Sequence, residues 1–211
     1  MSNIRGWKPR EIKGNPLVSI TIASYLVEDP RRWDSLMCLL YSLKAQTYPN
    51  WEALIIHDGP LEGNHGRIDA IETMGHVRQI RFIETGQRMA KFGHPWRSFG
   101  FSRTRGDYIC STNDDNYVCP SYIEWLLSEL VNQQADFAYC DCVHSHKQWQ
   151  PMTTELKRGK IDLGCWMASA DLVKKTKWID FNFAGDWSYI HKLKHEAKKI
   201  VKVPATLFVH N

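Results

Sequence analysis

Residues 106–120 read GDYICSTNDDNYVCP, a stretch in which an apolar run meets four consecutive amide and carboxylate side chains. The apolar run at 107–111 predicts a strand, and a helical pattern follows Pro120. Residues 113–116 therefore fall where a strand of a sheet ends. Two interpretations are open at this point. The cluster is either a turn whose Asn or Asp side chain caps the next helix, or a pair of carboxylates that holds a divalent cation.

Apolar strands and amphipathic helices alternate on both sides of this stretch. Strands are predicted at 17–25, 51–57, 77–84, 107–111, 137–143 and 200–209. Helices are predicted at 29–45, 67–75, 96–105, 121–133, 170–177 and 186–199, and 144–161 is predicted to be a long loop or hairpin. Strands that alternate with helices at this spacing form βαβ units, which predicts an α/β fold with a mostly parallel sheet.

The composition is that of an ordinary globular protein, with 43% hydrophobic and 24% charged residues in a chain of 211. Its formal charge of +4 comes from scattered Lys and Arg rather than a basic run, so an anionic small substrate is expected and a nucleic-acid partner is not. Six cysteines without a CxxC pair indicate thiols in a reducing compartment. We therefore expect a soluble, cytoplasmic protein.

Membrane contact is expected to be peripheral at most. No apolar run approaches the roughly 18 to 20 residues that cross a bilayer. The Lys-rich segment 192–202 is either a solvated face or a surface attracted to anionic lipid.

Chemistry in an open α/β sheet is expected beyond the carboxyl ends of its strands. Neither GxGxxG nor GxxxxGK[ST] is present, so groups other than a glycine-rich loop must neutralise any phosphate. The adjacent carboxylates Asp114 and Asp115 repel one another unless a cation lies beside them, and oxygen ligands favour Mg²⁺ or Mn²⁺. The alternating Cys and His residues of 140–146 span about 20 Å on one strand face, too far for a tetrahedral zinc ion to gather.

Three segments recur in order in a known family: LVSITIASY (17–25), SLKAQTYPNWEALIIHDGP (42–60) and GDYICSTNDDNYVCP (106–120). Together they resemble the inverting family 2 glycosyltransferases of GT-A fold. The similarity runs from about residue 17 to 127 and then thins to AGDWSYIHKL (184–193) and FVHN (208–211).

The resemblance implies one GT-A domain over residues 1–211, with a mixed, mostly parallel sheet and helices on both faces. Residues 1–120 would form the nucleotide-binding half and 121–211 the acceptor-binding half. From the compact size and the end at Asn211, we expect a domain that is part of a longer protein. The chain also looks similar to virus-encoded glycosyltransferases that build capsid glycans in large algal viruses, which would act in the host-cell cytoplasm.

Nucleotide-sugar contacts are implied for residues at the strand ends. Tyr25 matches a residue that stacks on the base, and Asp58 matches a carboxylate that accepts a hydrogen bond from the uracil ring. Without the resemblance these are a half-buried strand-end aromatic and a turn residue. Ala23 is implied to contact the nucleotide sugar, and Asp114 to face the ribose or donor sugar. Arg97 is either near the diphosphate or a solvated helix residue.

A metal site is implied by two further positions. Asp115 matches the metal ligand, and His210 matches a His after the last strand that completes the coordination of Mn²⁺ or Mg²⁺ in many relatives. His210 is otherwise a frayed chain end. Asn113 stands where the family has its first Asp, a departure that weakens metal affinity in principle.

The general base of the family matches Asp186, whose alternative interpretation is an ordinary helix N-cap. Trp166 and Trp187 lie in the half expected to face the acceptor, where they would form a wall of the acceptor site or belong to the core.

These implications predict a metal-dependent, inverting transfer of a hexose or deoxyhexose, such as glucose, galactose or rhamnose. The donor would be a UDP-sugar, and the acceptor a hydroxyl of a glycan that can be protein-linked. Two alternatives remain. One is a catalytically inactive GT-A module that binds nucleotide or glycan. The other is a sugar-nucleotide pyrophosphorylase, although SYLVEDPRR (24–32) lacks the glycines of its loop.

Overall fold

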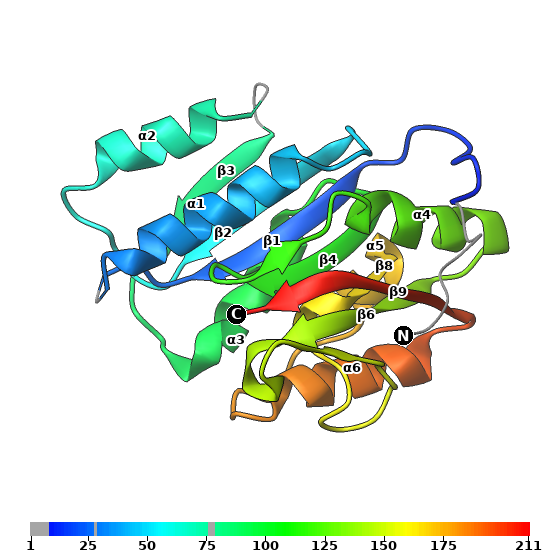
Figure 1. Ribbon diagram of the computed structural model, residues 1–211. Helices are drawn as coiled ribbons and strands as arrows, with labels where there is room; N and C mark the ends of the chain where they lie inside the picture. Colours follow the sequence, from blue (N-terminus) through cyan, green and yellow to red (C-terminus); the bar gives the residue numbers. More distant parts are fainter. Residues whose placement is uncertain (1–8, 28, 76–78) are drawn as a thin grey trace.

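The computed structural model of the chain describes residues 9–27, 29–75 and 79–211. Within them a nine-stranded mixed sheet runs in the order β3-β2-β1-β4-β8-β6-β9-β5, and β7 pairs with β6 at its side. Helices cover both faces of this sheet (Figure 1). The predicted α/β architecture is confirmed.

The first four strands in sheet order are parallel, and the sheet becomes mixed beyond them. β1, β2, β3 and β4 pair in parallel, β8 is antiparallel to both β4 and β6, and β9 is parallel to β6 but antiparallel to β5. The strands are β1 (Val18–Ser24), β2 (Trp51–His57), β3 (Ile80–Glu84), β4 (Tyr108–Asn113), β5 (Tyr117–Val118), β6 (Phe137–His144), β7 (Gln150–Met152), β8 (Trp166–Ser169) and β9 (Ile200–His210).

The helices connect these strands in the expected alternation. They are α1 (Arg31–Lys44), α2 (His65–Thr73), α3 (His94–Arg103), α4 (Tyr122–Gln133), α5 (Ala170–Lys175) and α6 (Gly185–Glu196), with short 3-10 turns at Lys91–Gly93, Ser145–Lys147 and Leu163–Cys165. Each predicted helix and strand is present with shifted ends, and the predicted strand residues 77–78 lie outside the described residues. The stretch 144–161 contains β7, which forms a hairpin with β6, as one of its two interpretations predicted. β5 and β8 were not predicted.

Two apolar cores lie on opposite faces of the sheet. The first is built on α1 and α4, whose apolar stripes are fully buried: Leu36, Leu39, Leu40 and Leu43 of α1, and Ile123, Leu126, Leu127 and Leu130 of α4. The second gathers side chains of α3, α5 and α6, among them Phe101, Leu172, Val173, Tyr189 and Leu193. Burying one such side chain contributes roughly 1.5–3 kcal/mol relative to leaving it exposed. Each face of the sheet is therefore held by its own helices.

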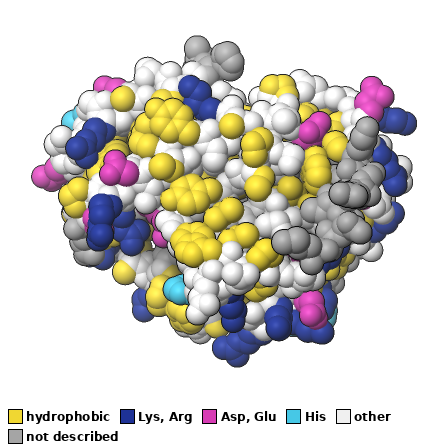
Figure 2. All heavy atoms as spheres, viewed as in Figure 1, with side chains coloured by type: hydrophobic (Ala, Val, Ile, Leu, Met, Phe, Trp, Pro, Cys, Tyr) yellow, Lys and Arg dark blue, Asp and Glu magenta, His cyan; other side chains and the backbone are white. Residues whose placement is uncertain are grey.

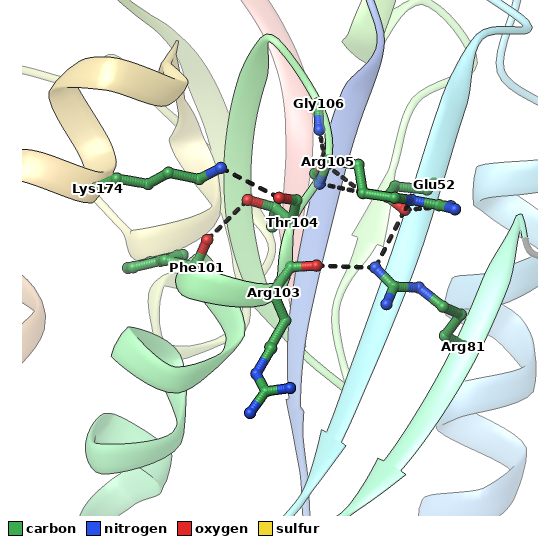
Figure 3. A network of polar contacts seen from close by, with 9 residues as sticks. Glu52, Arg81, Phe101, Arg103, Thr104, Arg105, Gly106 and Lys174 are labelled. Atoms are coloured by element: carbon green, nitrogen blue, oxygen red, sulfur yellow. Dashed lines mark hydrogen bonds and ion pairs between the residues drawn. The ribbon is translucent and has the colours of Figure 1, made fainter.

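A buried polar network joins the sheet to the turn between α3 and β4 (Figure 3). Glu52 of β2 accepts hydrogen bonds from Ser19 Oγ at 2.7 Å and from the backbone N–H and the Nε–H of Arg105, both at 2.8 Å. Arg81 of β3 reaches the same carboxylate at 3.2 Å. Burial alone would raise the pKa of Glu52, but the hydrogen bonds from Ser19 and Arg105 outweigh it and lower that pKa. The network fixes the amino-terminal ends of the strands, opposite the edge expected to bind ligand.

The surface viewed from the α1 side is mixed in character. Figure 2 shows apolar side chains gathered near the middle of this face and Lys and Arg side chains toward its margins. All six cysteines are free thiols. Among the described residues, each helix is too short or too polar to cross a bilayer.

Candidate active site

A cavity of about 490 Å³ opens at the carboxyl ends of β1 and β4. Its lining includes five residues that the sequence predicted for a nucleotide-sugar and metal site: Ala23, Tyr25, Asp58, Asp114 and Asp115. Ala23 pairs with Asn113 and Ser24 pairs with His57, so β1, β2 and β4 end at the same edge of the sheet. This parallel register brings the five residues together. A cavity of this size and position can hold a small ligand.

Asp114 points into the protein rather than across the cavity. Its carboxylate accepts hydrogen bonds from Ser24 Oγ at 2.8 Å and from the backbone N–H of Tyr25 at 3.1 Å, and Arg32 lies 3.6 Å away. Burial raises the pKa of Asp114 to about 6, against the opposing effect of the Ser24 hydrogen bond. Asp114 therefore ties the end of β4 to the end of β1, and Asp115 is the partly exposed carboxylate of the pair at the cavity.

Asp58 organises one wall of the cavity. Its carboxylate accepts hydrogen bonds from the backbone N–H groups of Met89 and Ala90, at 2.7 and 2.8 Å, and from Trp96 Nε1 at 2.6 Å. The wall is strained, because Ala90, Lys91 and Phe92 have φ angles of 54°, 53° and 58°, a left-handed region that costs non-glycine residues energy. A carboxylate offers about four acceptor directions, so Asp58 can accept one further donor.

Tyr25 contributes an aromatic surface to the cavity. The guanidinium of Arg88 lies 4.0 Å from the centre of its ring, in cation–π geometry, and the ring of His57 stacks 5.8 Å away. The predicted stacking residue is thus placed on the cavity lining.

Three basic side chains on the cavity were not predicted: Arg32, Arg88 and Lys91. Arg32 lies in the first turn of α1, the helix that follows β1, and the other two follow β3. The signal was available, since DPRR and RMAK place cations just beyond strand ends, where ligands of open sheets bind. These cations can supply the phosphate-neutralising charge that no glycine-rich loop provides.

Arg97 lies beneath the cavity rather than in it, with only 2% of its surface exposed. Its guanidinium donates to Ser111 Oγ at 3.3 Å, to the carbonyl of Thr112 at 3.2 Å and to the side-chain oxygen of Asn113. Neither sequence interpretation, diphosphate contact or solvated helix residue, anticipated this burial. Arg97 orients the start of the acidic cluster.

Four carboxylates surround the buried Arg97. Burial lowers the pKa of its guanidinium, while Asp186, Asp162, Asp114 and Asp115, in decreasing order, act to raise it. The cavity carboxylates and Asp186 are therefore within electrostatic range of one central cation, although they come from β4 and from α6.

Asp186 lies in the first turn of α6, with its side chain 39% exposed. The N-cap position belongs to Ala184, which makes no side-chain capping bond, so the alternative interpretation of Asp186 as the N-cap is wrong. A carboxylate in the first helical turn is stabilised by the helix dipole. Its Oδ1 lies 3.4 Å from Nδ1 of His94.

His210 pairs with His144 in the β6–β9 ladder, so it belongs to a strand and not to a frayed end. Nε2 of His210 lies 3.8 Å and Nε2 of His144 lies 3.9 Å from the same oxygen of Asp162. Among the described residues, these three form a group whose possible ligand atoms lie within 4.8 Å of one another. The backbone N–H of Asn211 donates to Asn116, which brings this group beside the acidic cluster.

The donor set of this group fits a divalent cation. Burial raises the pKa of Asp162 and lowers that of His144 to about 4, so the imidazole of His144 is neutral near pH 7. The backbone N–H of His146 donates to Nδ1 of His144 at 3.2 Å, which leaves His144 to donate its Nε2–H toward Asp162. Asp162 and His210 are then the better ligands. Mixed carboxylate and imidazole donors suit Mn²⁺ more than the all-oxygen shell of Mg²⁺. Asp162 carried no sequence signal, because only the pairing of β6, β8 and β9 brings it here.

The prediction that Trp166 and Trp187 form a wall of the acceptor site is wrong for Trp166. Trp166 is completely buried and stacks 6.1 Å from Phe137 in the second core, so it cannot touch an acceptor. Trp187 is only partly buried and packs beside His191 on α6, one residue after Asp186.

The sequence profile of the family described as Glycosyl transferase family 2 matches residues 19–186. The match covers most of the chain, and the chain belongs to this family. Its curated relatives include an uncharacterized glycosyltransferase of Haemophilus influenzae, 28% identical over 60% of this chain and 49% of that protein. Glycosyltransferase GlyA of Streptococcus pneumoniae is 28% identical over 57% of this chain and 16% of that protein. The chain thus aligns with half or less of the length of these relatives.

Solved structures share the fold. TarS of S. aureus (residues 1–349) superposes with a TM-score of 0.75 at 14% identity, covering 92% of this chain and 60% of that one. TarS in complex with UDP-GlcNAc gives 0.73 at 15% identity, over 91% of this chain and 57% of that one. The mannosyltransferase PcManGT of Pyrobaculum calidifontis, in complex with GDP-Man and Mn²⁺, gives 0.68 at 11% identity, over 95% and 58%. The predicted GT-A fold is confirmed.

Proposed function

We propose that this protein transfers a sugar from a UDP-sugar to a hydroxyl of a glycan acceptor, with inversion at the anomeric carbon. The observation that carries the proposal is the cavity at the strand ends, where Asp115 lies beside Arg32, Arg88 and Lys91. A nucleoside diphosphate needs this combination, because its phosphates require cations and its leaving group requires charge neutralisation. The complexes of TarS with UDP and with UDP-GlcNAc support UDP as the nucleotide.

Each cavity residue has a role in this proposal. Tyr25 stacks on the base, Asp58 accepts the uracil N–H, and Ala23 lies against the nucleotide sugar. Asp114 holds the ends of β1 and β4 together at the ribose. The cations of the cavity bind the phosphates, while Arg97, which is buried, positions Asn113 instead of touching the diphosphate.

Asp115, His210 and Asp162 are the residues that would hold a divalent cation, and Nε2 of His144 lies 3.9 Å from the carboxylate of Asp162. Mn²⁺ fits this donor set best. When bound, the ion neutralises negative charge on the departing diphosphate. The Mn²⁺ in the PcManGT complex supports this assignment.

Asp186 is the general base that removes the proton from the acceptor hydroxyl. Its exposed position on α6 leaves one side free for an acceptor, and Trp187 follows it as part of the acceptor wall. In this proposal residues 1–120 bind the nucleotide and 121–211 bind the acceptor within a single domain. Glucose, galactose and rhamnose remain predictions for the donor sugar, and so does the likeness to algal-virus capsid glycosyltransferases.

The test combines calorimetry with a donor screen. Titration with UDP should show binding that Mn²⁺ strengthens, and one of UDP-glucose, UDP-galactose, UDP-rhamnose and UDP-GlcNAc should release UDP. Asp186→Asn should lower turnover by about 10²- to 10⁴-fold while UDP affinity stays within about twofold. The matched control is Asp171→Asn, a change of an exposed carboxylate on α5.

Three results would contradict the proposal. Tight UDP binding without UDP release from any donor would identify an inactive binding module. Formation of a UDP-sugar from UTP and a sugar 1-phosphate would identify a pyrophosphorylase. Full turnover in Asp186→Asn would remove Asp186 as the base.

A further inference from the structure

A buried nitrogen of His94 and a buried oxygen of Asp186 face each other without a hydrogen bond. His94 begins α3, and its side chain is only 2% exposed, while Asp186 lies in the first turn of α6. Nδ1 of His94 and Oδ1 of Asp186 are 3.4 Å apart. Within the described part of the chain, both atoms are buried and neither has a hydrogen-bond partner. Buried polar atoms nearly always have a hydrogen-bond partner, so two buried atoms that face each other without one need an explanation.

The protonation of the His94 ring follows from its other nitrogen. Nε2 lies 3.1 Å from the backbone carbonyl of Asn182, and a carbonyl oxygen only accepts. Nε2 must therefore carry a hydrogen. In a neutral ring Nδ1 then presents a lone pair to the carboxylate oxygen of Asp186. Two acceptors face each other, and a single added proton would satisfy both.

The surroundings hold the ring in this orientation. The indole of Trp178 stacks on His94 with ring centres 5.0 Å apart. Gly185 allows α6 to approach, because a Cβ at this position would come within 2.7 Å of His94 Cδ2 and 2.5 Å of the carbonyl oxygen of Asp180. The contact between the two helices is thus built around the pair.

Few charged groups face His94. Burial lowers the pKa of the imidazole, Asp186 and Asp180 oppose this effect, and Arg97 reinforces it. The net direction is downward, so the ring is neutral near pH 7. Asp186 therefore works beside a neutral acceptor and not beside an imidazolium that would already hold the proton.

We infer that His94 is a positioning residue, whose Nδ1 accepts a hydrogen bond from Asp186 once that carboxyl group has gained the acceptor proton. This inference rests on the proposed function. The acceptor oxygen bonds to the anomeric carbon, the bond from that carbon to the diphosphate oxygen breaks, and the acceptor proton moves to the exposed oxygen of Asp186. A half-turn of the carboxyl group about its Cβ–Cγ bond then directs the O–H to Nδ1 of His94, and the proton leaves to solvent after the products.

This arrangement has two consequences for catalysis. The hydrogen bond to Nδ1 stabilises the protonated carboxyl group that forms when Asp186 removes the acceptor proton, so His94 favours this proton transfer. The turned carboxyl group also holds the proton away from the new glycosidic oxygen.

Kinetics on a ring variant test the inference. His94→Phe keeps an aromatic ring against Trp178 but removes both nitrogens. We expect kcat to fall about 10- to 100-fold with the donor KM unchanged. The acid limb of the kcat profile should move to lower pH by about one unit, because the protonated form of Asp186 loses its partner. Trp178→Phe alters the stacking but keeps the pair, and its acid limb should not move. An unmoved acid limb in His94→Phe would overturn the inference.

Nitrogen-15 NMR of the histidine rings tests the pair without any substrate. We expect the Nε2–H tautomer for His94, and a His94 pKa that falls further in Asp186→Asn, where the opposing carboxylate is lost. An Nδ1–H tautomer, or an identical His94 pKa in both proteins, would refute the pair even if His94→Phe failed to fold. A normal NMR result without turnover of any UDP-sugar would instead leave the pair intact and reject the proposed function.

Discussion

Two buried charged side chains, Glu52 and Arg97, each organise a stretch of backbone that no apolar contact could hold. Glu52 collects donors from β1, β3 and the turn before β4. Arg97 collects acceptors from the end of β4. Buried charges of this kind are tolerated where hydrogen bonds compensate their burial. Glu52 bonds to the turn before β4 and Arg97 bonds to its end, and β4 is therefore fixed at both ends.

Glu52→Gln should destabilise the protein by about 3 kcal/mol at pH 7, because a neutral amide no longer balances Arg105 and Arg81. The folded-state pKa of Glu52 is lowered, so its contribution is present above the ordinary value of 4.5 and is lost as pH falls through the lowered pKa. Urea unfolding of both proteins at several pH values would measure the difference, which should shrink below about pH 4.5. Glu62→Gln, at an exposed site, is the control. A difference that is constant with pH would contradict the assignment.

The sequence predicted the location of some site residues and not of others. Tyr25, Asp58 and Asp115 were predicted because a carboxyl-terminal strand edge can be read from one segment of chain at a time. Trp166 was misjudged because burial depends on what the rest of the fold packs against it. Asp162 was missed for the same reason, since its neighbours are more than 15 residues away in sequence.

At the scale of elements, the long helices and strands were predictable and the short strands were not. α1 has an apolar stripe with a helical period over 14 residues, and β2 is a continuously buried run of 7 residues. β5 has only 2 residues and β8 has 4, too few to display a period, and both exist because neighbouring strands pair with them. The mixed part of the sheet could therefore not be predicted, and neither could the placement of His210 beside Asp162.

The turn Leu163–Cys165 depends on close contact with β9. A Cβ on Gly164 would lie 2.1 Å from the ring of Phe208, an overlap that must be relieved by movement of the strand. Gly164→Ala should therefore lower the free energy of unfolding by about 1–3 kcal/mol and weaken Mn²⁺ binding, since Asp162 and His210 flank the contact. Chemical denaturation and calorimetry would measure the two effects.

The control is Gly66→Ala in α2, where a Cβ meets nothing within 4 Å. This change should be neutral or stabilising by up to about 1 kcal/mol, because Ala favours a helix. Equal stability of Gly164→Ala and wild type would show that β9 can shift without loss.

At the scale of the whole molecule, the sheet brings the residues proposed for the donor site, at the ends of its parallel strands, together with the residues proposed to bind the metal, from its mixed part. Asp115 follows the parallel strand β4, whereas His210 lies on β9 and Asp162 precedes β8, where parallel and antiparallel pairs mix. Ligand binding should therefore stabilise the fold as a unit.

Saturating UDP with Mn²⁺ should raise the melting temperature by roughly 5–10 °C, since a ligand at 100 times its Kd contributes about 2.7 kcal/mol. Asp115→Asn should remove the part of this shift that depends on Mn²⁺, and Asp171→Asn should retain it. Differential scanning fluorimetry with UDP alone, Mn²⁺ alone and both together would measure the shifts. A shift with UDP that ignores Mn²⁺ in the wild type would contradict the metal assignment.

The two apolar cores hold the two faces of the sheet separately. Arg32 lies on α1, which covers one face of the sheet, and Asp186 lies on α6, which covers the other face. Core substitutions that destabilise the packing of α1 should weaken donor binding and leave proton removal intact. Core substitutions beneath α6 should slow proton removal and leave donor binding intact. In the proposed function, donor binding and acceptor activation can therefore change independently during evolution.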